Sequence, residues 1–167
     1  MLNHPRNLAL IALFVVAACS NSAVPLTELM NGAQPLPRIT TAGQPDQAVL
    51  QKLADAGYTA IIDLRRPDED RGYDEKSAVE ALGMKYISIP ISGGDAINYE
   101  NASLLDETLN EVDGPVLLHC ATSNRVGALL SLREHMHGAS ADDSLTLGTQ
   151  AGLGSLRETV EVRLSER

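Results

Sequence analysis

The sequence predicts an α/β domain with a largely parallel central sheet flanked by helices. The apolar runs at 58–64 and 116–119 have the nearly continuous hydrophobic character of buried strands, and the segment 86–90 is a further predicted strand. Segments with the apolar spacing of amphipathic helices separate these runs. Strands that alternate with helices along a chain favour a parallel sheet with helical crossovers.

The expected elements follow one another without an internal repeat. In the first half they are a strand at 38–41, a helix begun by Asp46 and ended by Gly57, the strand at 58–64, and a helix at 75–82 closed by Gly83. In the second half they begin with the strand at 86–90, a helix capped by Asn101 that carries Leu104, Leu105, Leu109 and Val112, and the strand at 116–119. A helix at 126–137 closed by Gly138, a helix from Asp142 or Asp143 and a last helix from about Gly154 follow. Asp and Asn accept hydrogen bonds from the free N–H groups of a helix start, and Gly adopts the left-handed conformation common at helix ends.

The amino terminus has the pattern of a secretory signal. Arg6 precedes an uncharged apolar stretch at 8–18, which is too short to remain as a membrane anchor. The stretch ends in Val-Ala-Ala before Cys19, and this junction resembles a bacterial lipobox. The resemblance implies cleavage before Cys19 and lipid attachment to its sulfur. Because Ser20 follows, it also implies the periplasmic face of the outer membrane. A plain signal peptide cut nearby is the alternative.

We therefore expect three parts in the chain. Residues 1–18 are a lipoprotein signal peptide, residues 19–37 a tether rich in proline, and residues 38–167 the catalytic domain. The expected localisation is export with a lipid anchor in a bacterial membrane.

The net charge of −9, from 22 acidic and 13 basic residues, argues against nucleic acid as a partner, because such binding depends on clustered Lys and Arg. Any anion site must therefore be local, made of backbone and a few arginines. No cofactor is expected. His135 and His137 stand two apart on a predicted helix and point to different faces, so no metal site is predicted.

The segment 115–127 carries the chemistry. A buried strand ends at His119, Cys120 follows, and Arg125 stands just before the predicted helix. A helix N-terminus stabilises a thiolate, and an arginine fork suits a tetrahedral oxyanion. With Cys19 lipidated, Cys120 has no cysteine to pair with, which marks it as a reactive thiol. The alternative is a buried core cysteine beside an ordinary surface arginine.

Two further strands end in loops with polar side chains. Arg65 follows the strand at 58–64, and Asp95 lies in the loop after the strand at 86–90. Ligands of parallel sheets bind beyond the carboxyl ends of the strands. We therefore expect Cys120, Arg65 and Asp95 to converge on one site. Asp63, at the end of its strand, is expected to bond loop amides, and Arg65 is alternatively a solvated loop residue.

Four segments, at 39–45, 60–65, 86–90 and 119–128, resemble the bacterial beta-lactamase-hydrolase-like, phosphatase-like family, also described as domain of unknown function 442. That family is similar in fold to cysteine-dependent dual-specificity (tyrosine) phosphatases. The resemblance implies a phosphatase-like fold with Cys120 as nucleophile and Arg125 as the anion-binding arginine. It also implies a cradle formed by the backbone amides of Ala121, Thr122, Ser123 and Asn124. Asp95 lies in the region where phosphatases keep their general acid, and Arg65 is placed to assist the anion.

The chain departs from the phosphatase pattern at three points. Four residues separate Cys120 from Arg125, whereas phosphatases of this fold have five and single-domain sulfurtransferases have four. Ser123 stands where the loop usually has Gly, so a positive φ there would cost about 1 kcal/mol. Val126 replaces a Ser or Thr whose hydroxyl helps the thiolate leave.

Three functions follow from these residues. The first is a phosphatase-like hydrolase that acts on a phosphorylated small molecule or protein through a phosphocysteine. The second is a rhodanese-like sulfurtransferase, in which Cys120 carries a persulfide and no acid is needed. The third is a module that only binds an anion or a partner. In each case the lipid on Cys19 would hold the protein at a membrane.

Overall fold

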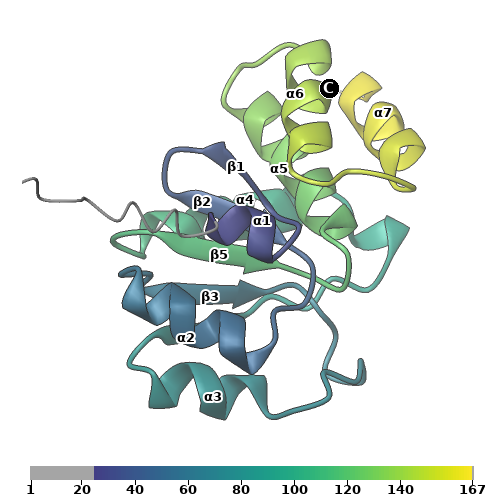
Figure 1. The fold of residues 1–167 in the computed structure, drawn as a ribbon. Coiled ribbons are helices and arrows are strands. Elements are labelled where there is room, and N and C mark those ends of the chain that lie inside the picture. Colours follow the sequence, from purple (N-terminus) through teal and green to yellow (C-terminus); the bar gives the residue numbers. More distant parts are fainter. Residues whose placement is uncertain (1–24, 167) are drawn as a thin grey trace, which may run out of the picture.

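The computed structural model describes residues 25–166, which form a five-stranded sheet covered by helices on both faces (Figure 1). The strand order is β1-β2-β5-β3-β4. The parallel strands are β2 (Ile39–Ala42), β5 (Val116–His119), β3 (Ala60–Asp63) and β4 (Lys85–Ser88), and β1 (Ala33–Leu36) is antiparallel to β2. The predicted α/β class with a largely parallel sheet is confirmed.

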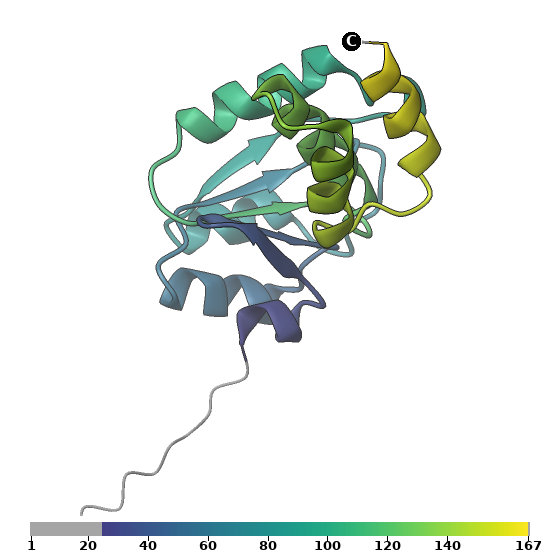
Figure 2. The same cartoon turned by 90° about the horizontal axis from the view of Figure 1, so that it is seen from above.

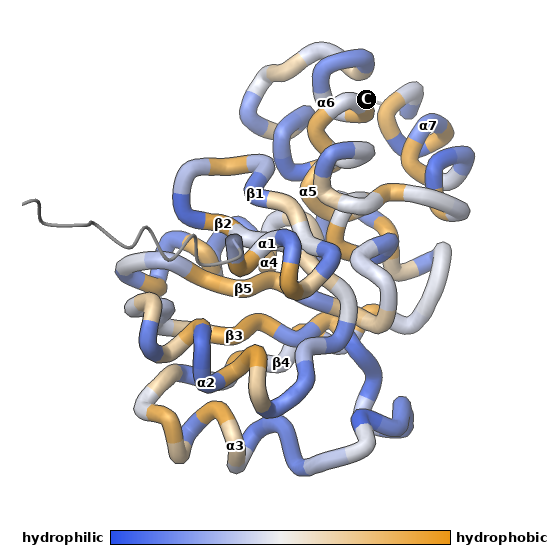
Figure 3. The backbone as a smooth tube through the Cα atoms, viewed as in Figure 1, coloured by the Kyte–Doolittle hydropathy of each residue, from blue (hydrophilic) through white to orange (hydrophobic). Residues whose placement is uncertain are grey.

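The helices form two layers, one on each face of the sheet (Figure 2). One layer holds α1 (Leu26–Leu29), α2 (Gln47–Asp55) and α3 (Glu75–Ala81). The other holds α4 (Tyr99–Asn110), α5 (Asn124–Met136), α6 (Ala141–Gln150) and α7 (Arg157–Ser165). The short 3₁₀ helix η1 (Gly94–Ala96) precedes α4. All residues of β3 and β5 are buried, and both strands are mostly hydrophobic in Figure 3, as expected for strands between two helical layers.

Two details of the predicted helices are wrong. The cap of α4 is Asn98, whose Oδ1 accepts a hydrogen bond from Asn101 N at 2.9 Å. Both asparagines are good caps, so the sequence did not distinguish them. Helix α5 begins at Asn124, two residues before the expected start.

The predicted tether at 19–37 is also wrong over most of its length. Residues 26–36 contain α1 and β1, and β1 pairs with β2 at the edge of the sheet. Pro35 suggested a linker, yet an edge strand tolerates proline because its missing N–H need not face a neighbour. The predicted signal and Cys19 lie outside the described residues. Among the helices of the described part, none has the length and apolar character needed to cross a membrane.

The register of the parallel strands aligns their carboxyl ends. His119 pairs with Ala42 on one side and with Asp63 on the other, and Asp63 pairs with Ser88. Four loops therefore leave the sheet along one edge, and they are the loops after β2, β5, β3 and β4. This alignment places the candidate site.

The helix that follows the Cys120 loop is held by a close crossing of α5 and α6. Gly127 and Gly148 face each other there, because a Cβ on Gly148 would lie 2.8 Å from the Gly127 carbonyl oxygen and 1.8 Å from Ser131 Oγ. Ser131 Oγ donates to the Gly127 carbonyl at 2.9 Å. The crossing thus fixes α5 two residues beyond Arg125.

We predict that Gly148→Ala destabilises the fold. The added methyl group meets backbone and the buried Ser131, and such overpacking costs about 1–3 kcal/mol, more than the gain in helix propensity. Urea unfolding measures the change. The matched control is Gly94→Ala, where the new Cβ would be 3.7 Å from its nearest neighbour. Equal stability of Gly148→Ala and wild type would show that the crossing is looser than described.

Candidate active site

The loop between β5 and α5 presents a helix N-terminus without a side-chain cap. Ser123 is the N-cap residue, but its Oγ donates to the Ala151 carbonyl at 2.8 Å instead of capping α5. The first bond of the helix runs from Gly127 N to Ser123 O at 2.9 Å. The N–H groups before Gly127 therefore have no carbonyl partner within the helix, which is the usual basis of an anion site.

Cys120 lies directly at this N-terminus, one residue after the end of β5, and is 1% exposed. Its neighbours Ala121 and Thr122 are exposed and form the outer part of the loop. The turn after β2 holds this part in place, because Gln44 N donates to Ala121 O at 3.4 Å and Gly43 bridges Thr122.

The backbone of Ser123 is in the left-handed region, with φ of 67°. The positive φ expected at this position is thus confirmed. The strain persists because the surroundings determine the position. The Oγ bond to Ala151 is one restraint, and the other is Gly152, where a Cβ would lie 2.5 Å from Ser123 Cβ.

The Asn124 side chain is turned toward the segment between α6 and α7. Its Oδ1 accepts from Gly154 N at 2.7 Å and Leu156 N at 3.3 Å, and its Nδ2 donates to Ser155 Oγ at 2.8 Å. Ser123 and Asn124 can therefore donate their backbone N–H groups to an anion, while their side chains hold the loop in place.

Arg125 is positioned by groups from two neighbouring loops. Its Nη1 and Nη2 donate to the two carboxylate oxygens of Glu69 at 2.6 and 2.8 Å. Nη1 also reaches the carbonyls of Ile91, at 3.1 Å, and Leu64, at 3.4 Å. None of these contacts uses Nε. The pKa of Arg125 is raised, chiefly by the hydrogen bond to Glu69, while burial acts in the opposite direction. Cys120 also raises this pKa, which shows that Arg125 and Cys120 lie close together.

Glu69 is a site residue that the sequence did not reveal. It also accepts from Arg66 N at 2.9 Å and Arg65 Nε at 3.3 Å. Chiefly because of the Arg125 hydrogen bond, the pKa of Glu69 falls to about 2. In the sequence it is one of three acids in the loop after β3, between Asp68 and Asp70, and nothing there distinguishes it.

Arg65 is buried and supports this loop. Its Nη1 donates to Gln44 Oε1, its Nη2 to the Asp70 carbonyl at 2.7 Å and its Nε to Glu69. The structure thus places Arg65 behind Glu69, with two of its guanidinium nitrogens bonded within its own loop and the third bonded to Gln44 in the loop after β2.

Asp95 lies in η1 and is exposed. The same loop begins near Arg125, since the Ile91 carbonyl accepts from Arg125. Gly93, with φ of 110°, provides a turn that favours glycine before η1. The Asp95 carbonyl accepts from Asn98 Nδ2 at 3.0 Å.

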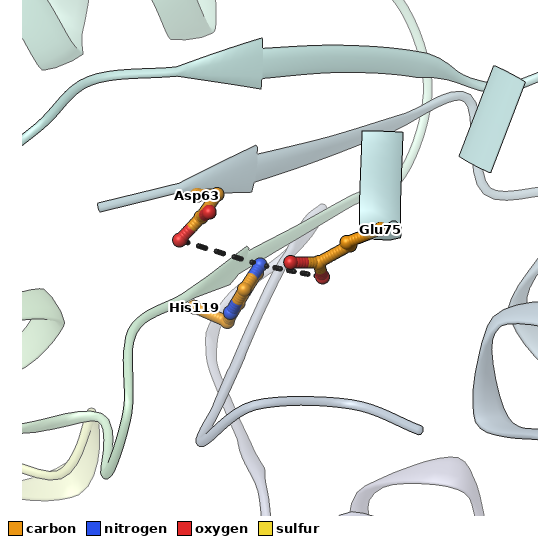
Figure 4. A group of neighbouring side chains, drawn as sticks. All are labelled: Asp63, Glu75 and His119. Carbon is orange, nitrogen blue, oxygen red and sulfur yellow. Dashed lines mark ion pairs between the residues drawn. The ribbon is translucent and has the colours of Figure 1, made fainter. Parts of the chain in front are cut away.

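Three buried side chains form a cluster behind the Cys120 loop: Asp63, Glu75 and His119 (Figure 4). Asp63 Oδ1 accepts from Arg65 N at 2.7 Å, so the expectation that Asp63 bonds loop amides is confirmed. One ligand atom from each of the three side chains in the cluster lies within 4.8 Å of the other two, a spacing that could hold a cation. Arg71 already pairs with both acids, however, at 2.6 Å to Asp63 and 3.6 Å to Glu75.

Residues 14–161 match the sequence profile of a family described as a DSP-PTPase phosphatase fused to NAD⁺ kinase. The chain belongs to this family. Its members are phosphatase-like hydrolases, and the resemblance found in the sequence is confirmed.

Named relatives and solved structures agree with this assignment. A beta-lactamase hydrolase-like protein of Agrobacterium fabrum is 36% identical over 105 residues, which are 60% of this chain and 24% of that protein. The chain thus matches about a quarter of the length of this curated relative.

Two solved phosphatase structures show the same fold. A phosphatase structure from Neisseria meningitidis has a TM-score of 0.68 at 20% identity, and the match covers 78% of this chain and 96% of the Neisseria chain. TpbA of Pseudomonas aeruginosa in complex with pTyr has a TM-score of 0.63 at 17% identity, covering 85% and 86%.

We predict that Glu69 stabilises the fold only at pH values where it is ionised. Because its pKa is about 2 in the folded protein and near 4.5 otherwise, the stabilisation is complete above pH 4.5 and is lost as the pH falls toward 2. Glu69→Gln should therefore be less stable than wild type at pH 6, with the difference shrinking on acidification. Urea unfolding at several pH values tests this. The control is the exposed Asp68→Asn, and a constant difference for Glu69→Gln would contradict the prediction.

Proposed function

We propose that this protein hydrolyses phosphate esters through a phosphocysteine formed on Cys120. The observation that carries the proposal is the uncapped N-terminus of α5, with Cys120 at its start and Arg125 in its first turn. Backbone donors, a helix dipole and a guanidinium at one point suit an anion that gains charge during reaction. Membership of a phosphatase-like family supports the same chemistry.

In the proposed reaction the Cys120 thiolate attacks phosphorus. The S–P bond forms as the P–O bond to the leaving group breaks, and Asp95 gives its proton to the departing oxygen. The amides of 121–125 and the guanidinium of Arg125 hold the remaining phosphate oxygens. Asp95 then takes a proton from water, whose oxygen attacks phosphorus and releases phosphate and the thiolate.

Glu69 sets the direction of Arg125 in this scheme. Its two oxygens engage both Nη atoms, while Nε makes none of those contacts. Arg125 can thus keep its bonds to Glu69 and still offer Nε to a bound phosphate. Glu69 is a positioning residue here, because it acts through Arg125.

The substrate in this proposal is a phosphorylated small molecule or protein. Because the neighbouring TpbA structure holds pTyr, an aryl phosphate is the reasonable first probe. Export and lipid attachment at Cys19 belong to the same proposal, and they would place the reaction at the periplasmic face of the outer membrane.

The second candidate is persulfide transfer, and the loop length favours it. Four residues separate Cys120 from Arg125, as in single-domain sulfurtransferases. In this reaction Cys120 takes the outer sulfur of thiosulfate, releases sulfite, and passes the sulfur to cyanide as thiocyanate. No proton donor is required, because the leaving group is a stable anion.

We expect the purified protein to turn over p-nitrophenyl phosphate, and Cys120→Ser to abolish this activity. Phosphate release and thiocyanate formation from thiosulfate and cyanide should be measured in parallel. Turnover of thiosulfate alone would replace the phosphatase proposal with the sulfur one. Turnover of neither, with tight phosphate binding, would leave a binding module.

We predict that Asp95→Asn lowers phosphate-ester turnover at least ten-fold for substrates with poor leaving groups, because general acid help is worth about 10²–10⁴ in rate. The loss should be smaller for p-nitrophenyl phosphate, whose leaving group needs less protonation, and thiosulfate turnover should not change. Asp113→Asn is the control, since Asp113 is exposed in the loop before β5, at the opposite edge of the sheet. Wild-type rates of Asp95→Asn on alkyl phosphates would remove Asp95 from the mechanism.

A further inference from the structure

The buried cluster behind the Cys120 loop contains more acid than base. Asp63, Glu75 and His119 have side chains with no exposed surface. Glu75 Oε1 lies 3.0 Å and Asp63 Oδ1 3.8 Å from the same atom, His119 Nε2. Both Glu75 oxygens and His119 Nε2 lack an aligned hydrogen-bond partner. A buried carboxylate in this state needs a positive charge close by.

The other ring nitrogen of His119 faces the nucleophile residue. His119 Nδ1 is 3.4 Å from the Cys120 carbonyl oxygen. Each neutral tautomer of histidine has one N–H donor and one lone pair. With the proton on Nε2, a lone pair faces the carbonyl of Cys120, and with the proton on Nδ1, a lone pair faces Glu75. Only the imidazolium presents an N–H to both oxygens.

The charge count decides between a proton and a metal ion as the missing charge. Asp63 and Glu75 carry two negative charges, and Arg71 supplies one positive charge at 2.6 and 3.6 Å from them. One proton on His119 makes the group neutral, whereas a divalent cation would leave a net positive charge in a buried place. Asp63 is moreover occupied by other donors, since its Oδ2 accepts from Tyr86 Oη at 2.7 Å and from Arg71 Nε at 2.9 Å.

Among the described residues, the charged or titratable groups with a stated interaction in this cluster form one connected network. They come from β3, the loop before α3, α3 itself and β4, and they are Asp63, Arg71, Tyr73, Glu75 and Tyr86. Burial and the nearby acids raise the pKa of both tyrosines, so the tyrosines remain neutral. Arg71 is tied to Asp63 and remains charged. The balancing proton can therefore sit on His119 or on the Glu75 carboxyl 3.0 Å away, and the measurement below distinguishes the two positions.

We propose that Glu75, supported by Asp63, is a positioning residue that keeps His119 doubly protonated, so that its ring orients the peptide between Cys120 and Ala121 for anion binding. In a trans peptide the C=O and the N–H point in opposite directions, and the described residues contain no cis peptide bond. A carbonyl drawn toward His119 therefore directs the Ala121 N–H away from it. His119 faces α3, where Glu75 Oε1 lies 3.0 Å from its Nε2, and Cys120 packs with residues of α5 on the other face of β5. This N–H therefore turns toward the Cys120 side.

The protonation of His119 can be tested by NMR on the wild-type protein, independently of any activity. The orienting role rests on the proposed function, but this measurement does not. We expect ¹⁵N shifts of both ring nitrogens of His119 to be those of an imidazolium at pH 7.5. In Glu75→Gln, one nitrogen should instead carry a lone pair. Glu80→Gln makes the same change on the exposed face of α3 and should leave the ring as in wild type. A neutral His119 in wild type, or one unchanged by Glu75→Gln, would overturn the proposal.

Oxyanion affinity reports the consequence for the loop. Tungstate, which binds without reacting, should bind about ten-fold more weakly to Glu75→Gln than to wild type or Glu80→Gln, since an amide donor is lost from the site. If none of the three proteins binds tungstate, the proposed phosphatase function fails while the NMR result still decides the protonation. Equal affinity in all three would overturn the orienting role. If the wild-type protein contains one metal ion per chain and Glu75→Gln contains none, a metal ion and not a proton balances the charge of this cluster, and the proposal is overturned.

Discussion

The register of the four parallel strands is the constraint on which the rest of the structure depends. It places Ala42, His119, Asp63 and Ser88 in one row, so the loops after β2, β5, β3 and β4 meet along one edge of the sheet. Because side chains alternate along a strand, the same register also puts Asp63 and His119 on one face. A slip of one residue would turn His119 toward the other helical layer and separate it from Glu75.

Acidic side chains near the site of this acidic protein are paired with neighbouring arginines. Two arginines share one carboxylate at the mouth of the loop, where Glu69 contacts Arg125 and Arg65. Deeper in the fold, Arg71 is shared by Asp63 and Glu75. A buried ion pair needs close partners to offset its lost hydration. These pairings leave the positive end of α5 as the place where an added anion finds donors, despite a net charge of −9.

The family is that of phosphatase-like hydrolases, and the departures from the phosphatase pattern bear on how well the site works. The left-handed Ser123 is held by Ala151 and Gly152 instead of by the freedom of a glycine. Val126 is buried and has no hydroxyl to offer the leaving thiolate. Such a loop can bind an oxyanion through its backbone. In the proposed scheme, the rate at which the phosphoryl group leaves Cys120 then depends on water and Asp95 alone.

The sequence by itself determined the alternation of strands and helices from residue 38 onward and the β5–α5 turn with Cys120 and Arg125, while the family resemblance implied the positive φ of Ser123. These features depend on local periodicity, turn residues and a short spacing, all of which a sequence displays. Only the tertiary structure decided that α1 and β1 belong to the domain, that Glu69 holds Arg125 and that Glu75 reaches His119. Partners in these contacts lie 56 and 44 residues apart. Which of several equivalent acids makes such a contact depends on the packing of distant loops, and no local pattern records it.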